Sequence, residues 1–395
     1  MLKKNIVNGT INFHSSIVYV NFAPYENAGK ILDYLIENFE LVSLFSFNFH
    51  RLGKKRDQNK LIVYRNGNVI NSKDLFDFKV PEKLIFFLLP IRSTLIFFQL
   101  LFYNTYLHFK YGKANYFFSV NAFTSWVGNV LKSFGFVDKT IFWVWDYYPP
   151  KHPRKIIIFM RWLYWQFDKM ATKSDILVFL NKRVANLHRS MGILQKTTVY
   201  KIIPIGTSPS FSKRNINKAK LKRLNIAFVG VIKKSQGLDI IFNNSKLYNK
   251  LSFKIKLDII GAGPEFAYYK ELANKTEYEC HFHGYISDKQ IDRILKKSHV
   301  GIAPYVPSKN NVAYFGDPSK IKQYLSSGLP VITTNVFEFS KEIKAHTAGI
   351  IINYNAQDLL KALRKITKSY PKYSGGAYNL AKKYSYKKIY STFFD

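Results

Sequence analysis

The chain has 395 residues, 47% of them hydrophobic, and 60 Lys and Arg against 25 Asp and Glu, which gives a formal net charge of +35. This length and composition exclude a disordered protein and favour two domains, each with its own hydrophobic core. The single cysteine, Cys280, excludes an internal disulfide and fits a cytoplasmic protein. The positive charge favours contact with phosphorylated substrates, anionic lipid or nucleic acid, although lysines spread over solvated faces would account for it equally well.

The first sixteen residues contain no apolar core of a secretory signal, so none is expected. Residues 15–25, 27–39 and 41–49 alternate as strand, helix and strand, which predicts a parallel sheet. The apolar segment 84–103 is long enough to cross a bilayer, but Pro90 and Arg92 interrupt it. We therefore expect a buried strand followed by a helix that leans on a membrane surface.

Further alternation of apolar and polar residues leads to "TIFWVWD", a predicted strand that ends at Asp146. Asp146 is equally well explained as a turn residue before the prolines that follow. Residues 154–170 form a helix that is apolar nearly all round, with Trp162, Trp165 and flanking Arg and Lys. Such a helix is either core or suited to a bilayer interface, where it would favour a lipid-linked acceptor.

The polar, basic segment 206–223 has no apolar periodicity and is predicted to link two domains. A second alternating series of strands and helices follows it. Because the carboxyl ends of parallel strands meet at one edge, their loops form a row where ligands bind. The predicted fold class is α/β, with two doubly wound Rossmann-like domains facing a cleft, at residues 1–205 and 224–375, and a C-terminal helix over 376–395.

Glycines and lysines gather in the predicted loops of the second domain. "FVGVIKKSQGLD" brackets lysines between Gly230 and Gly237, and "IIGAGPE" follows the next strand. In "GDPSKIKQYLSSGLPVITT", Asp317 is expected to cap a helix, with Pro318 as its first residue. Lys320 then opposes the helix dipole unless an anion such as phosphate lies beside it.

Over Ile226 to Thr334 these turns, together with "FHGYI" and "HVGIAPY", resemble the nucleotide-sugar half of GT-B glycosyltransferases of the glycosyl transferase group 1 family. The resemblance implies transfer of a sugar from a nucleotide diphosphate sugar to a hydroxyl acceptor, with retention, in synthesis of cell-surface polysaccharide or glycolipid. It implies Asp146 and Asp317 as catalytic residues. The donor-binding residues implied are Gly230, Lys233, Lys234, Gly261, Gly284, Tyr285, Ser319, Lys320 and Gln323.

The sequence departs from the family pattern at several donor positions. Gln323 stands where the family has a Glu that binds the ribose, and the earlier acidic position falls at Phe315. Val231 and Gln236 replace an Arg and a Lys. An inactive GT-B module that only binds a nucleotide or partner is therefore the first alternative. A nucleic-acid-binding protein is a second, although the chain has no recognised motif of that class.

No metal is expected in the reaction, because the sequence contains no Asp-x-Asp motif. His281 and His283 alternate on one predicted strand, but the sequence offers no evident third ligand for zinc. They are interpreted as sheet-surface residues beside a Gly284-Tyr285 loop that contacts the base. The leaving diphosphate is then neutralised by cations and helix N-termini.

Overall fold

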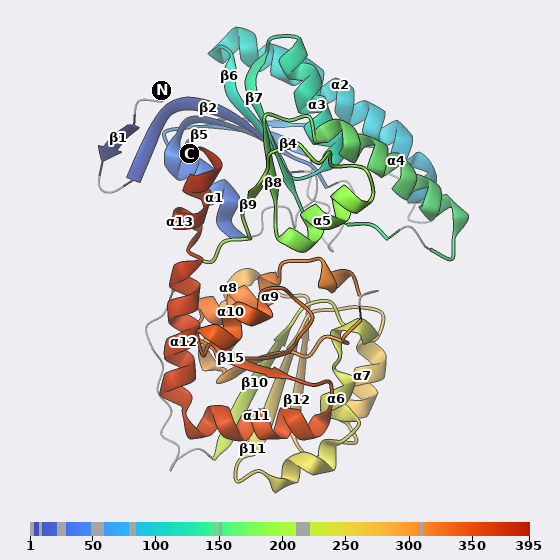
Figure 1. Ribbon diagram of the computed structural model, residues 1–395, viewed down its shortest axis with the longest axis vertical. Coiled ribbons are helices and arrows are strands. Elements are labelled where there is room, and N and C mark those ends of the chain that lie inside the picture. The colour runs from blue at the N-terminus through green and yellow to red at the C-terminus, as the bar shows by residue number, and fades with distance from the viewer. Residues whose placement is uncertain are drawn as a thin grey trace. The chain divides into compact units, whose positions relative to one another are not determined.

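A computed structural model describes residues 4–7, 10–21, 29–48, 59–78, 84–145, 147–149, 152–210, 222–308 and 311–395. The chain divides into two compact units. The first is Met1–Pro204 together with Tyr390–Asp395, and the second is Ile205–Ile389. Each unit holds a sheet with helices packed against it (Figure 1). Two α/β units were predicted, and this fold class is confirmed.

The first sheet, in the described part of the unit, has the order β5-β4-β3-β2-β6-β7-β8-β9, with β1 paired to β2. Neighbours from β3 to β9 pair in parallel, while β1, β4 and β5 pair antiparallel. Its strands are β1 Lys4–Val7, β2 Thr10–Asn21, β3 Phe39–Ser46, β4 Lys60–Arg65, β5 Asn68–Asp74, β6 Ala114–Ser119, β7 Val137–Val144, β8 Ile176–Phe179 and β9 Lys201–Ile202. Its helices are α1 Ile31–Asn38, α2 Ile85–Tyr111, α3 Ala122–Ser133, α4 Lys155–Ala171 and α5 Lys182–Ser190.

The apolar segment predicted as a strand followed by a helix is a single helix, α2, and the predicted strand was wrong. Pro90 lies within the helix, and Arg92 is 1% exposed with its guanidinium 2.9 Å from Asp77. The buried face of α2, with Leu89, Ile96 and Leu100, packs into the core beneath the sheet. A helix satisfies its own backbone hydrogen bonds, whereas a strand needs a neighbouring strand. A long apolar segment can therefore form a helix when one of its faces packs against a hydrophobic core.

The last residues of the chain complete the core of the first unit. The Phe393 ring lies 5.2 Å from Phe118 and 5.0 Å from Trp143, centroid to centroid. Phe394 contacts the rings of Phe39 and Tyr116 at 5.1 and 5.2 Å. The Phe393–Phe118 pair is tilted and the other three pairs are edge-to-face, and such pairs add to the free energy of burying the rings themselves. This aromatic cluster explains why the chain end belongs to the first unit.

The second sheet is parallel throughout the residues described, in the order β12-β11-β10-β13-β14-β15. The order reverses direction between β10 and β13, and ligands bind at such a switch point in open α/β sheets. Its strands are β10 Arg223–Val229, β11 Lys254–Ile260, β12 Glu279–Gly284, β13 Val300–Ala303, β14 Val331–Thr334 and β15 Gly349–Ile352.

Helices cover both faces of the second sheet, and two hydrophobic clusters fill the space between (Figure 1). They are α6 Asp239–Phe242, α7 Phe266–Ala273, α8 Asp288–Lys297, α9 Ser319–Ser326, α10 Ser340–Ala345, α11 Ala356–Lys368 and α12 Tyr370–Lys383. Helix α13 Tyr386–Tyr390 ends the unit, and the 3-10 turn η7 Ser391–Phe393 after it belongs to the first unit. Short 3-10 turns of the second unit are η4 Lys234–Gln236, η5 Ser245–Lys250 and η6 Val312–Tyr314. Helix α9 and strand β14 confirm the helix and strand predicted over 316–334, but Pro318 occupies the N-cap and Asp317 makes no side-chain cap.

Candidate active site

The loops after β10 and β11 pack backbone against backbone at the carboxyl edge of the second sheet. Gly230 and Gly261 have φ angles of 137° and 134°, which side chains other than glycine rarely adopt. Gly230 donates its N–H to the carbonyl of Ile260 at 2.9 Å. A Cβ at Gly261 would lie 2.0 Å from the carbonyl oxygen of Gly230. Both glycines are therefore required for this close approach, as their predicted place in the loops suggests.

The amine of Lys320 lies directly over Gly230. A Cβ added at Gly230 would lie 2.5 Å from the Lys320 Nζ. The amine donates to the side-chain oxygen of Gln236 at 2.5 Å, and it lies 4.4 Å and 4.9 Å from the ring centres of Phe228 and Tyr305. The hydrogen bond to Gln236 and the two ring contacts stabilise the ammonium group, but none of them carries a negative charge that would neutralise it. Lys320 therefore points to the loop glycines, as the sequence predicted.

Helix α9 holds Lys320 in this position. Tyr324 lies one turn further along the helix, and its hydroxyl accepts the N–H of Val229 at 2.7 Å. The same hydroxyl donates to the carbonyl of Ile302 at 3.3 Å. Because Val229 ends β10 and Ile302 lies in β13, Tyr324 fixes the first turns of α9 at the switch point between these strands.

Electrostatics leave the Lys320 site short of negative charge. Among the residues that the structure describes, no carboxylate forms an ion pair with the amine. Burial, followed by the positive charge of Lys233, lowers the Lys320 pKa to about 7. An anion bound beside Nζ would offset both effects and restore the charged form. The geometry thus provides a cation, glycine backbone and a helix N-terminus for a phosphate group.

The loop after β13 supports the lysine-bearing loop after β10. The Asn311 side chain donates to the carbonyls of Ser235 and Val306, each at 3.1 Å. A Cβ at Gly237 would lie 1.9 Å from the carbonyl oxygen of Pro304. The sequence analysis did not identify Asn311. Its side chain caps the 3-10 turn η6, and an Asn directly before a helical turn is a recognisable capping signal.

Asp317 does not face this site. Its Oδ2 lies 2.5 Å from the Lys322 amine and accepts the Ile205 N–H at 2.6 Å. The Lys322 amine also donates to the carbonyl of Ile205 at 2.6 Å. The side chains of Asp317 and Lys322 are 5% and 2% exposed. This buried ion pair replaces the predicted capping role of Asp317, because Lys322 and the backbone of Ile205 both use its carboxylate. Contact of Asp317 with the sugar stays a prediction.

The other predicted donor-binding residues lie around Lys320 and the two loop glycines. Lys233 and Lys234 are exposed in the loop after β10, and Gln323 is half-buried on the same face of α9 as Lys320. The N–H of Ser319 already donates to the carbonyl of Asp317 at 2.9 Å. Ser319 is exposed, so its hydroxyl is the group that can reach a ligand. Gly284 accepts the N–H of Gly261 at 2.8 Å.

Tyr285 follows Gly284 and is 79% exposed, so its ring is available to a ligand. Asp146, the other residue predicted to be catalytic, lies outside the described residues. The structure thus brings Gly230, Gly261, Gly284, Lys233 and Lys320 to one edge of the sheet.

Residues 210–387 match the model of the family described as glycosyl transferases group 1. The comparison with curated proteins found no significant match.

Solved structures resemble nearly the whole chain. Sucrose-phosphate synthase from Thermosynechococcus elongatus has 14% identity and a TM-score of 0.64, over 96% of this chain and 98% of that one. A trehalose-6-phosphate synthase studied for glycosyl transfer with retention has 14% identity and a TM-score of 0.63, with the same coverage. Anabaena HepE in complex with UDP has 12% identity and a TM-score of 0.60, again over 96% and 98%. These similarities identify the GT-B fold.

Proposed function

Residues 210–387 belong to the glycosyl transferases group 1 family, and from this premise we propose that the chain transfers a sugar from a uridine diphosphate sugar to a hydroxyl acceptor. The observation that carries the proposal is the amine of Lys320, which lies over Gly230 and has no carboxylate partner in the part of the chain that the structure describes. UDP in the solved structure of Anabaena HepE supports the choice of nucleotide. The similar trehalose-6-phosphate synthase, studied for transfer with retention, supports that stereochemistry.

The proposed reaction breaks the bond between the sugar and the diphosphate and places negative charge on the leaving oxygen. Lys320 in its charged form stabilises that oxygen, with further charge from Lys233 and Lys234. Gln323 lies on the same face of α9, where its amide can hydrogen-bond the ribose hydroxyls. Asp146 is proposed to orient the acceptor or to stabilise positive charge at the anomeric carbon. We propose that these cations, and no metal, neutralise the diphosphate.

Thermal unfolding with a ligand series tests this function. UDP is expected to raise the melting temperature of the protein, and uridine is expected to have little effect, because only the diphosphate engages Lys320. Slow hydrolysis of a UDP-sugar, measured as UDP release, would support catalysis. Binding of UDP without any turnover would favour an inactive binding module, and equal shifts by uridine and UDP would contradict the proposed diphosphate site.

Helix α2 supports a finer proposal, namely an acceptor that is held at an anionic membrane. Its exposed apolar side chains recur three, four or seven residues apart, so they lie within an arc of about 80° on the helix. They are Ile91, Phe98, Phe102, Tyr106 and Phe109, which are 40–82% exposed. Within the described residues, no helix is long and apolar enough to cross a membrane. An apolar stripe on a chain of net charge +35 suits contact with the surface of an anionic bilayer.

Replacing Phe98 and Phe102 together with serine is expected to weaken binding to phosphatidylglycerol-containing vesicles more than tenfold, because each buried ring contributes about 1.5–3 kcal/mol. Co-sedimentation measures the binding. Val199→Ser is the matched control, since Val199 is 90% exposed in the same unit but lies outside α2. UDP affinity should stay unchanged in both proteins. Unaltered vesicle binding by the double variant would refute this role of α2, and loss of self-association instead would assign the stripe to a second copy of the chain.

A further inference from the structure

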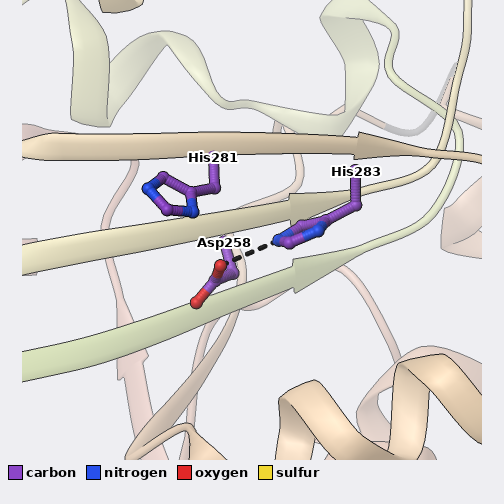
Figure 2. Close-up of side chains that lie close together, drawn as sticks. All are labelled: Asp258, His281 and His283. Atoms are coloured by element: carbon purple, nitrogen blue, oxygen red, sulfur yellow. Dashed lines mark hydrogen bonds and ion pairs between the residues drawn. The ribbon is translucent and has the colours of Figure 1, made fainter.

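One carboxylate and two imidazoles lie together on β11 and β12. Asp258, His281 and His283 each offer one ligand atom, and these atoms lie within 4.8 Å of one another. Figure 2 shows the three side chains on the same side of the sheet. The parallel register pairs Asp258 with His281, and His283 follows two residues later on the same face. The sequence offered no third ligand for the two histidines, whereas strand pairing supplies one.

Two hydrogen bonds of the cluster bear on metal binding, one between the ligands and one behind them. Nε2 of His283 lies 2.8 Å from Oδ1 of Asp258, and an ion bound between them replaces this hydrogen bond. Nε2 of His281 lies 2.8 Å from Oε1 of Glu279, which leaves Nδ1 of His281 for a ligand. Metal-bound imidazoles commonly donate their second N–H to a carboxylate, which fixes the ring and raises its basicity. Glu279 is in turn held by Arg223 at 3.0 Å.

The three side chains of the cluster differ in their exposure to solvent. The side chain of Asp258 is 7% exposed, that of His283 is 26% exposed and that of His281 is 45% exposed. An ion can therefore enter past His281 and keep a water molecule as a further ligand. One group opposes binding: the Lys256 amine lies 3.4 Å from Oδ1 of Asp258. Its side chain is 20% exposed, so the flexible amine can withdraw toward water.

We propose that Asp258, His281 and His283 bind one divalent transition-metal ion, with zinc as the best fit. Two imidazoles and a carboxylate are a common protein ligand set for zinc, whereas magnesium and calcium prefer oxygen ligands alone. On binding, the single proton of the neutral His283 ring moves from Nε2 to Nδ1 by exchange with water, so that the Nε2 lone pair binds the ion. The ion joins edge strand β12 to β11 just before Gly284. This site is independent of the proposed sugar transfer.

Zinc titration of the metal-free full-length protein tests the proposal. We expect one equivalent to bind and, at zinc concentrations about a hundredfold above the dissociation constant, to raise the melting temperature by about 5–10 °C. His281→Ala and His283→Ala should each weaken binding more than tenfold. Glu279→Gln should weaken it about tenfold, because it removes the charged partner of a ligand. Lys256→Met should tighten it several-fold, because it removes a competing positive charge.

Two control variants separate this site from incidental zinc binding. His346→Ala removes a histidine that also contacts a carboxylate, Glu342, but lies in a different part of the unit. Cys280→Ser removes the thiol, which packs toward the core on the opposite face of β12. Both should bind zinc like the parent protein, and magnesium should not compete. Unchanged affinity in His281→Ala and in Lys256→Met, or loss of binding in Cys280→Ser, would overturn the proposal, and circular dichroism confirms that each variant is folded.

Discussion

Replacing Lys320 with methionine is expected to weaken UDP binding about 10- to 100-fold, because a hydrogen bond to a charged group contributes about 1.5–3 kcal/mol. The same replacement should raise the melting temperature of the ligand-free protein at pH 7. Lys320 is partly buried beside two aromatic rings, and no carboxylate of the described residues pairs with it, so its charge is a cost that only an anion offsets. Affinity for the donor and stability of the free protein therefore oppose each other at this residue.

The pH dependence of Lys320 gives the prediction a second readout. Its pKa is lowered to about 7 in the folded protein by burial and by Lys233, whereas an unfolded lysine titrates near 10.4. Between these values the unfolded chain binds more protons, so the free energy of unfolding rises with pH. The penalty is complete below pH 7 and absent above pH 10.4. The stability gained by Lys320→Met should therefore be largest at pH 7 and below, and should vanish as the pH approaches 10.4.

UDP binding should follow the opposite trend. Only the charged amine attracts the diphosphate, so the dissociation constant of the parent protein should rise as the pH increases above 7. Isothermal titration calorimetry at several pH values, and thermal melts of the same samples, measure both effects. Lys270→Met, an exposed lysine on α7, is the matched control and should change neither quantity. A Lys320→Met protein that binds UDP normally, or one that is destabilised at pH 7, would contradict the proposed site.

Asp317→Asn is expected to destabilise the second unit by about 3–5 kcal/mol, because it leaves the Lys322 amine buried without its charged partner. Lys322 is 2% exposed, and its amine lies 5.0 and 5.2 Å from the ring centres of Phe339 and Tyr384. The asparagine can also present its NH2 group to the Ile205 N–H, which then loses its acceptor. Chemical denaturation of the parent and the variant measures the loss.

The double variant Asp317→Leu with Lys322→Met distinguishes the pair from its individual charges. Removing both charges should recover much of the stability, since an apolar replacement of a buried pair is often neutral or better. Glu271→Gln is the control, because its pair with Lys275 is about 70% exposed on both sides and should contribute less than about 1 kcal/mol. A stable Asp317→Asn protein that loses turnover would instead support the catalytic role that the sequence predicted for Asp317.

Local rules account for much of the second unit. Buried runs such as β10 and β13 are recognisable because central parallel strands are largely apolar on both faces. Gly230 and Gly261 are recognisable because a glycine after such a run marks a turn at the ligand-binding edge. The segment 84–103 shows the limit of these rules. Apolar content alone did not distinguish a strand from a helix there, and the exposed face of α2 leaves no local signature.

The partners of charged side chains depend on segments far apart in the chain. Gln236 stands where the family has a lysine, and only the structure shows its oxygen accepting from Lys320, 84 residues away. The Asp317 carboxylate binds Lys322 and also accepts the N–H of Ile205, which lies 112 residues earlier in the sequence. This contact helps to hold the carboxylate away from a ligand.

By itself, the sequence determined the α/β class, the order of the loops and the presence of Lys320 in the same row of loops as Gly230 and Gly261, because strand periodicity and turn chemistry act over a few residues. Only the tertiary structure decided that Asp317 forms a buried ion pair with Lys322 and that Asp258 lies next to His281 and His283. Register between distant strands and burial of facing charges set these contacts, and both arise only when the sheet assembles.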